Sequence, residues 1–340
     1  MSLDAPRFWW RPPGWQAWAL SPVSAIYGAV ARRRLVTAPR EPVDLPVLCV
    51  GNFTVGGSGK TPVAIALAKQ AAEMGRKPGF LSRGHGGSSS APRIVDPAAD
   101  SARDVGDEPL LLAAHAPVAV SPDRAAAARM LAAQGCDFLI MDDGFQSARI
   151  LFDYALLVVD ARHGIGNGKV LPAGPLRAHV ADQLHYADAV LRMGEGTAAD
   201  PVLQAAPGAG KPVFGAVLRP RNPARFAGRR MLAFAGIGHP DKFFETLRQA
   251  GAEVAVAQPF PDHHFYAADE LQSLADTAQG QNLGMVTTAK DAARLSGMGL
   301  PAEILGMVEV LEIDAVFEDD RTAERIVRDA LAAWKKRWPT

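Results

Sequence analysis

The chain has 340 residues, enough for one large domain or two of ordinary size. Hydrophobic residues make up 48% of it, which supplies a packed core and excludes a disordered chain. Lys and Arg number 36, as do Asp and Glu, so the net charge of zero gives no bulk attraction to nucleic acid, and no nucleic-acid partner is expected.

The N-terminal segment is apolar and rich in aromatic residues. Four of the six tryptophans lie in residues 8–36, and the stretch 15–31 carries no charged side chain before Arg32-Arg33-Arg34. This stretch is at the short limit for a membrane-spanning helix, and its charge order does not fit a secretion signal. Aromatic residues and arginines beside an apolar helix favour the membrane–water interface, so residues 1–36 are predicted as a membrane-associating helix. The alternative is a helix packed on the protein's own core.

After a linker at 37–46, apolar strands alternate with helices, which predicts a parallel sheet covered on both faces. The expected strands are Val47–Val50, Phe80–Ser82, Val118–Val120, Phe138–Met141 and Tyr154–Val159, with helices at 61–74, 107–114 and 123–135. The two cysteines, Cys49 and Cys136, fall in apolar runs and are expected to be buried free thiols.

A second unit is expected to begin near residue 212. Residues 231–249 repeat the order strand, glycine loop, helix; strand, helix and strand follow at 253–257, 267–277 and 285–288, and 321–336 form an amphipathic helix. We therefore predict an α/β fold with a larger domain at 37–211 and a smaller α/β domain at 212–340.

The stretch GNFTVGGSGKTPVA, residues 51–64, lies between the first strand and its helix. It ends in the signature of a phosphate-binding loop, Gly59-Lys60-Thr61, although Thr54 stands where the usual pattern has glycine. Lys60 is expected to neutralise the β- and γ-phosphates of a nucleotide, and Thr61 to offer its hydroxyl to Mg²⁺. The predicted nucleotide contacts are Thr54, Gly56, Gly57, Ser58, Gly59, Lys60 and Thr61. The alternative is a tight turn with a surface lysine.

Acidic residues follow a strand and begin a helix. Asp142 and Asp143 end the strand FLIM, where a carboxylate that reaches Mg²⁺ or its waters is expected; the alternative is a turn-forming Asp-Asp-Gly. Asp107 and Glu108 in GDEP stand at a helix start, where carboxylates are often caps. In a phosphotransferase, however, a carboxylate must accept the proton of the attacking hydroxyl or help to bind metal.

Two loops complete the candidates. In FPDHHFY, Asp262 could orient the imidazole of His263, although adjacent histidines on a loop are often structural. The glycine-rich stretch 160–177 is long for a simple crossover, and its basic residues suit an anionic substrate; the alternative is a flexible surface loop. Substrate contacts are predicted at Arg83, Glu108, Asn167 and Arg177.

Together, and in this order, the motifs resemble the tetraacyldisaccharide 4′-kinase family. The matching stretches are VGNFTVGGSGKTP, LSRGHGG, GDEP, DDGFQ, VDARHGIGNGKVLPAGPLR, FAGIGHPDKFF, FPDHHFY and TTAKD, which span residues 50–291. Two positions depart from the family pattern: Ala178 replaces a glutamate after PLR, and His85 replaces a tyrosine in RGYGG.

The resemblance implies an enzyme on the cytoplasmic face of the bacterial inner membrane. It would move the γ-phosphate of ATP, with Mg²⁺, to the 4′-hydroxyl of a lipid disaccharide 1-phosphate, and it would have two α/β/α domains joined by a hinge. By the same resemblance, Asp107 is the base for the hydroxyl, His263 raises its readiness to take a proton, and Asp142 and Asp143 surround Mg²⁺. The resemblance specifies no oligomeric state.

Other classes of protein share parts of this pattern. A membrane-associated ATPase switch of the partition type carries a lysine before the glycine pair, where this chain has Val55. A soluble small-molecule kinase or ligase has no need of the N-terminal tryptophans and arginines. A binding module without catalysis has no need of the acids at 107, 142 and 143.

Overall fold

The computed structural model describes residues 5–88, 91–146, 149–296 and 302–337, and within them the strands form a nine-stranded and a four-stranded sheet. The larger sheet has the order β13-β8-β7-β6-β1-β5-β2-β4-β3. Its strands are β1 Val47–Asn52, β2 Pro78–Ser82, β3 Arg93–Ile94, β4 Val118–Val120, β5 Phe138–Asp142, β6 Tyr154–Asp160, β7 Ala189–Met193, β8 Val213–Pro220 and β13 Ile313–Phe317.

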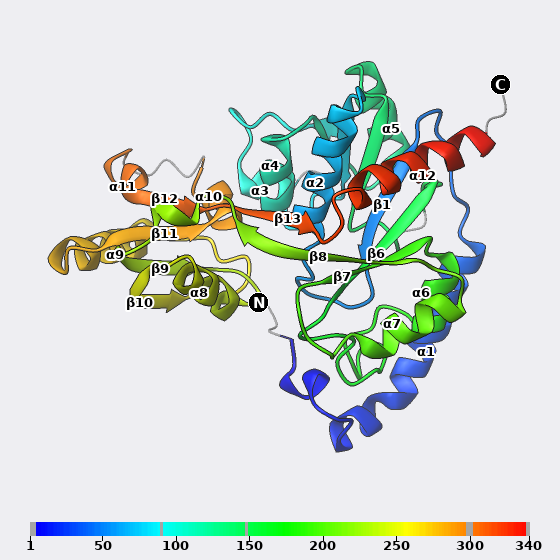
Figure 1. Ribbon diagram of the computed structural model, residues 1–340, viewed down its shortest axis with the longest axis horizontal. Helices are drawn as coiled ribbons and strands as arrows, with labels where there is room; N and C mark the ends of the chain where they lie inside the picture. The colour runs from blue at the N-terminus through cyan, green and yellow to red at the C-terminus, as the bar shows by residue number, and fades with distance from the viewer. Residues whose placement is uncertain (1–4, 89–90, 147–148, 297–301, 338–340) are drawn as a thin grey trace.

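Most neighbours in this sheet are parallel, and helices cover both of its faces (Figure 1). One face packs on α2 Lys60–Glu73, α4 Asp107–Ala113 and α12 Thr322–Arg337, with the short α3 Ala102–Val105 beside α4. The other face packs on α1 Trp15–Thr37, α5 Arg124–Ala133, α6 Val180–Tyr186 and α7 Asp200–Gly208. The predicted α/β class and its parallel sheet are confirmed.

The smaller sheet is parallel throughout, in the order β10-β9-β11-β12. It contains β9 Arg230–Ala235, β10 Glu253–Pro259, β11 Gly284–Thr288 and β12 Val308–Leu311. Around it lie α8 Pro240–Gln249, α9 Ala268–Gly280, α10 Ala289–Leu295 and α11 Ala302–Met307; the 3₁₀ turns are η1 Arg7–Trp10 and η2 Pro223–Arg225.

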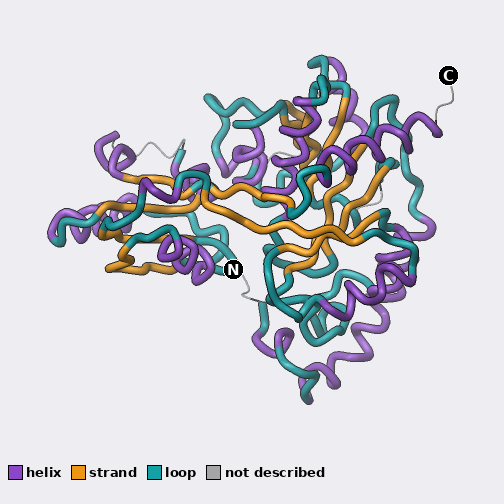
Figure 2. Tube along the Cα trace, in the orientation of Figure 1, coloured by secondary structure: helices purple, strands orange, loops and turns teal. Residues whose placement is uncertain are grey.

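Two antiparallel strands join the units. β8 leads out of the larger sheet toward the smaller one, and β13 returns beside it, so the orange strands of Figure 2 run on between the two parts of the molecule. Through β13 the chain comes back to the larger unit, where α12 follows. The sheets therefore do not separate at residue 212: β8 pairs with β7, and residues 313–337 pack with the first unit rather than with the second.

The start of the phosphate loop is fixed by close packing. Gly51 lies in β1, and a Cβ atom there would lie 2.6 Å from Cβ of Phe145 and 2.9 Å from Cδ2 of Leu157. Phe145 itself is fully buried. Because no side chain larger than hydrogen fits, Gly51 lets the segment after β5 lie directly against β1, which brings Asp142 beside Val50 in the parallel register. Cys49 and Cys136 are both buried and free, as expected.

Candidate active site

The phosphate loop leaves β1 and enters α2 with the backbone that the sequence predicts. Gly56 and Gly59 have φ of +103° and +84°, values that residues with a Cβ rarely adopt. The first N–H groups of α2, beginning at Lys60, have no partners within the helix and lie at its positive end. An anion is therefore favoured at this loop.

The adjacent acids after β5 diverge, as expected. Thr61 Oγ1 donates to Asp142 Oδ2 over 2.9 Å. Burial, reinforced by the charge of Glu108, raises the pKa of Asp142 to about 7. Asp143 instead has φ of +54° and contacts other residues, Lys60 and Arg177.

Asp143 lies between two cations. Lys60 Nζ is 3.8 Å from its Oδ1, and Arg177 Nη2 donates to its Oδ2 over 2.9 Å. Although burial alone would raise the pKa of Asp143, the charges of Lys60 and Arg177 bring it below the ordinary value. Asp143 is thus an ionised group that orients both cations at the loop.

The glycine-rich stretch 160–177 forms one wall of the phosphate loop. Val55 N–H donates to the Pro175 carbonyl over 2.9 Å, and Arg177 Nε donates to the Thr54 carbonyl over 3.1 Å. Thr54 therefore does not break the loop, since its backbone is held by Arg177. Asn167 has an internal role: its amide donates to the Ala173 carbonyl over 2.8 Å and accepts from the backbone of Lys169.

The site has the unpaired oxygens that Mg²⁺ and a nucleotide require. Asp142 Oδ1, Asp143 Oδ1 and Ser58 Oγ are buried without a hydrogen-bond partner. Among the described residues, no group of three or more His, Cys, Asp or Glu side chains could hold a metal ion. Mg²⁺ typically takes one or two carboxylates together with phosphates and waters, so Thr61 and Asp142 fit the ion.

Asp107 begins α4 and faces the second unit. Its Oδ2 lies 3.2 Å from His263 Nδ1 and accepts from Arg294 Nε over 2.9 Å, while its Oδ1 accepts the N–H of Glu108 over 2.9 Å. Gly106, with φ of +93°, lets the chain turn into this helix. The fold thus brings Asp107 into contact with residues more than 150 positions away in the sequence.

These contacts affect the protonation of Asp107 and His263. Burial would raise the pKa of Asp107, but the hydrogen bond from His263 and the charges of Lys290 and Arg294 hold it well below the usual range. In turn the carboxylate raises the pKa of His263. In this arrangement the imidazole favours the ionised form of Asp107. The support of Asp107 by His263 as a proton acceptor stays a prediction.

Lys290 also reaches this site from α10, without having been predicted to do so. Its Nζ contacts Glu108 Oε1 at 2.5 Å, and this ion pair lowers the pKa of Glu108. The charges of Glu108 and Asp107 outweigh burial and raise the pKa of Lys290. The signal was the order of TTAKD after an apolar strand, because polar residues at the carboxyl end of a parallel strand commonly line a site. Glu108 thus holds a cation of the second unit.

Arg83, an expected substrate contact, follows β2 and is exposed. The ring of His85, one of the two departures from the family pattern, lies 6.2 Å from that of His263. A second junction joins the ends of β6 and β9: Lys242 Nζ contacts Asp160 Oδ2 at 2.5 Å, and His163 stacks on His239 with ring centres 4.7 Å apart.

The N-terminal helix α1 has two different faces. Its buried residues include Ala17, Ser24 and Gly28, and Ser24 Oγ donates to the Val170 carbonyl over 2.8 Å. The opposite face exposes Trp15, Trp18, Val23, Ile26, Tyr27, Val30 and Val36. In the part of the chain that the structure describes, no helix is long and apolar enough to cross a membrane.

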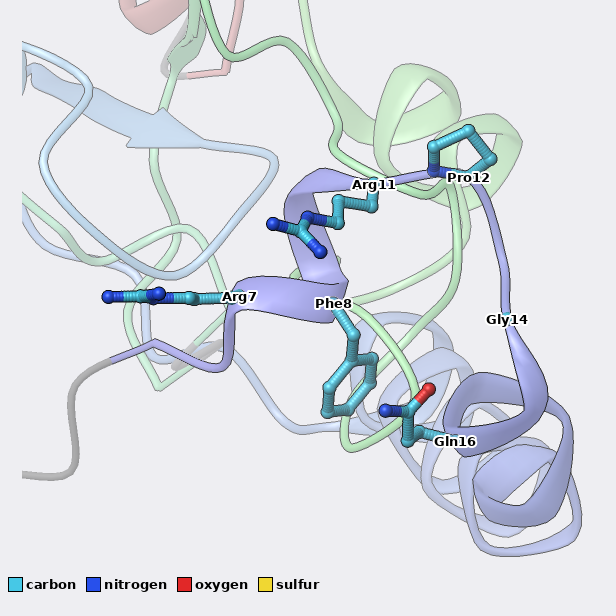
Figure 3. Close-up of a pocket in the computed structure, with 6 residues that line it drawn as sticks. All are labelled: Arg7, Phe8, Arg11, Pro12, Gly14 and Gln16. Atoms are coloured by element: carbon cyan, nitrogen blue, oxygen red, sulfur yellow. The ribbon is translucent and has the colours of Figure 1, made fainter.

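A cavity of about 320 Å³ lies where η1 meets α1, away from the phosphate loop. Figure 3 shows Phe8 and Gln16 facing each other there, with Arg7 and Arg11 on the same segment. The two arginines stand on the N-terminal side of the exposed tryptophans of α1, so positive charge lies at both ends of its apolar face.

A phosphate loop backed by a strand-end aspartate is the arrangement of P-loop proteins, and a further buried carboxylate, Asp107, begins α4. The sequence model of the tetraacyldisaccharide-1-P 4′-kinase family matches residues 16–332, so the chain belongs to that family. Proteins named tetraacyldisaccharide 4′-kinase from Mesorhizobium japonicum and Brucella canis are 62% and 54% identical to it, over 99% of each chain.

A solved structure shares the fold. The crystal structure of LpxK from Aquifex aeolicus in complex with ATP superposes with a TM-score of 0.72 over 92% of this chain and 99% of that one. At 24% identity the likeness concerns the fold.

Proposed function

We propose that this chain transfers the γ-phosphate of ATP to the 4′-hydroxyl of tetraacyldisaccharide 1-phosphate, which yields the bisphosphorylated lipid of lipid A synthesis. The observation that carries the proposal is the hydrogen bond between Thr61 and Asp142 at the start of α2, close to the acids of α4. Burial and then the charge of Glu108, the immediate neighbour of Asp107, raise the pKa of Asp142. Family membership supplies the acceptor.

Each residue then has a role in the transfer. Lys60 and the loop N–H groups would hold the phosphates, and Thr61, Asp142 and Asp143, which lie in contact with one another or with Lys60, would hold Mg²⁺. Mg²⁺, when bound, neutralises phosphate charge. Asp107 accepts the hydroxyl proton as the oxygen forms its bond to the γ-phosphorus. The bond from phosphorus to the β,γ-bridging oxygen breaks, and ADP leaves with that electron pair.

The partition-type alternative is not favoured. Those switches use the residue before the glycine pair as a second phosphate-binding lysine, whereas Val55 here donates its backbone N–H to Pro175. Val55 thus joins the phosphate loop to the stretch 160–177 through its backbone.

The test is transfer of labelled γ-phosphate from ATP to tetraacyldisaccharide 1-phosphate in detergent, with Lys60→Met beside the intact protein. We expect labelled lipid from the intact chain and a loss of about 100-fold or more in the variant, as for removal of a group that stabilises phosphoryl charge. Lys69→Met is the matched control, since Lys69 lies on the same helix but pairs with Asp314. An intact protein that labels no lipid contradicts the proposal.

We also propose that the apolar face of α1 lies in the cytoplasmic surface of the inner membrane, where the acceptor resides. Trp15 and Trp18 are 76% and 61% exposed, and aromatic side chains beside arginines suit the interface. Flotation with anionic vesicles tests this. The protein that carries both Trp15→Ser and Trp18→Ser should no longer float with the vesicles. The control Val316→Ser, at an exposed apolar residue of β13, should still float with them. Equal flotation of both variants contradicts the membrane role.

A further inference from the structure

Arg294 is an arginine fixed inside the protein. Its side chain is 1% exposed, and Nη1 donates to Asp291 Oδ1 over 2.6 Å and to the Gly236 carbonyl over 2.8 Å. Asp291, fully buried, also accepts from Tyr266 over 2.7 Å and from Thr288 over 2.6 Å. The guanidinium is therefore held in one orientation by the second unit, and its position moves only with that unit.

From this position Arg294 reaches across to the first unit. Its Nε donates to Asp107 Oδ2 over 2.9 Å, the oxygen that His263 also contacts, whereas Asp107 Oδ1 accepts a single backbone N–H from Glu108. The two carboxylate oxygens thus differ in their surroundings: two cationic side chains anchor Oδ2, and Oδ1 keeps lone-pair capacity for another donor.

We propose that Arg294 is a positioning residue for phosphoryl transfer: it fixes Asp107 Oδ2 from the second unit, keeps the carboxylate ionised, and so leaves Oδ1 to receive the proton of the attacking hydroxyl. This inference rests on the proposed function. Asp107 then acts as the base only when the second unit lies against the first, so proton acceptance depends on the positions of β11 and α10.

The charges around Asp107 set the direction of the test. The charged and titratable groups on the elements packed against α4, together with its own neighbour, are Lys60, Lys69, Glu73, Arg103, Asp104, Glu108, Lys290, Asp291 and Arg294, with Asp262, His263 and His85 on the facing loops. Burial pushes the pKa of Asp107 upward, and Lys290, Arg294 and His263 oppose it. Without Arg294, part of that opposition is lost, so the pKa of Asp107 rises and the carboxylate protonates at higher pH.

The experiment compares the pH dependence of transfer in the intact protein with three variants. Arg294→Met removes the cation. Arg294→Met combined with Asp291→Asn removes it without leaving the buried Asp291 carboxylate unpaired. Arg294→Lys keeps the positive charge but not the planar guanidinium with its several N–H donors. Arg225→Met, which removes an exposed arginine that pairs with Glu309 in the second unit, is the control. Rates from about pH 5 to 9 and the Kd for ATP are measured for each.

We expect Arg294→Met and the double variant to lose about tenfold or more in kcat, to keep ATP binding, and to lose a larger share of kcat than the intact protein as pH falls toward about 5. Arg294→Lys should recover part of kcat, with a pH profile close to that of the intact protein. The same relative loss toward the acidic end of this range in the double variant and the intact protein, or equal losses of kcat in the Lys and Met variants, would overturn the inference. If the intact protein transfers no phosphate, the proposed function fails instead, so the two failures are distinct.

Discussion

Replacing Asp107 with Asn removes one charge from a buried cluster and the proton acceptor from the site. The carboxylate side chain is 4% exposed and pairs with Arg294, which is 1% exposed. After the replacement, Arg294 still holds Asp291, so the guanidinium is not left without a counter-ion. The change then weakens the charge-assisted hydrogen bonds from Arg294 and His263 and does not create an isolated buried charge.

The magnitude follows from these contacts. A hydrogen bond to a charged group contributes about 1.5–3 kcal/mol, and relief of the carboxylate's desolvation offsets part of it, so we expect a loss of about 1–2 kcal/mol in the free energy of unfolding. At roughly 2–4 °C per kcal/mol, the melting temperature should fall by about 2–8 °C. General-base catalysis contributes about 10²–10⁴ in rate, and a carboxylate with a lowered pKa is a weak base, so kcat should fall by about 10².

The assay measures transfer to the lipid acceptor and thermal unfolding on the same preparations. Asp269→Asn, an exposed acid at the start of α9, is the matched control and should change neither. A kcat for Asp107→Asn within about threefold of the intact protein would refute the role of Asp107 as base. An unchanged melting temperature would refute the pairing with Arg294 as a source of stability.

Three further predictions concern the loop and its surroundings. Gly51→Ala should lower the free energy of unfolding by about 1–3 kcal/mol in chemical denaturation, because its Cβ would lie 2.6 Å from Phe145 Cβ. Gly57→Ala is the control and should leave the free energy of unfolding unchanged, because a Cβ there would have nothing within 4 Å. Equal stabilities of the two variants would contradict the close packing at Gly51. Arg177→Met should lower kcat/KM for ATP by about tenfold or more, with partial recovery in Arg177→Lys; an unchanged kcat/KM would show that its contacts with the loop are dispensable. The pKa of His263 is raised, so its pairing stabilises the protein fully below the unfolded pKa of about 6.5 and is lost as pH rises through the folded value. The melting temperature of His263→Gln should therefore lie below that of the intact protein at about pH 6 and approach it as pH rises toward 9; a constant difference would contradict the linkage.

Sequence reasoning predicted the parts of the site that are local in the chain. Lys60 and Thr61 follow from strand, loop and helix in order, and Asp142 follows from its place at the end of the neighbouring strand. The divergence of Asp142 and Asp143 follows from their adjacency.

The surroundings of Asp107 could not be predicted in this way. Its partners His263 and Arg294 come from the second unit, and only the folded chain shows that both contact the same oxygen. The direction of the pKa shift depends on that geometry, because burial and the paired cations act in opposite senses. The contacts of Asn167 also come from the folded chain: its amide completes the turns of its own loop, and its predicted contact with substrate stays a prediction.

The N-terminal segment shows how two sequence interpretations can describe different faces of one helix. Ala17, Ser24 and Gly28 pack on the core, as the docked-helix interpretation required. Trp15 and Ile26 are exposed, as an interfacial helix requires. The apolar composition of the stretch does not distinguish the two interpretations, because both faces of α1 contain apolar residues, Leu35 among those that pack on the core.

The position of the new phosphate tests the central claim most directly. The purified protein is incubated with ATP, Mg²⁺ and tetraacyldisaccharide 1-phosphate, in parallel with the acceptor analogue that lacks the 4′-hydroxyl, and the lipid products are analysed by mass spectrometry. The account predicts one added phosphate, at the 4′-oxygen, on the first acceptor and none on the analogue. Phosphate on the analogue, or ATP hydrolysis with neither lipid phosphorylated, would contradict it.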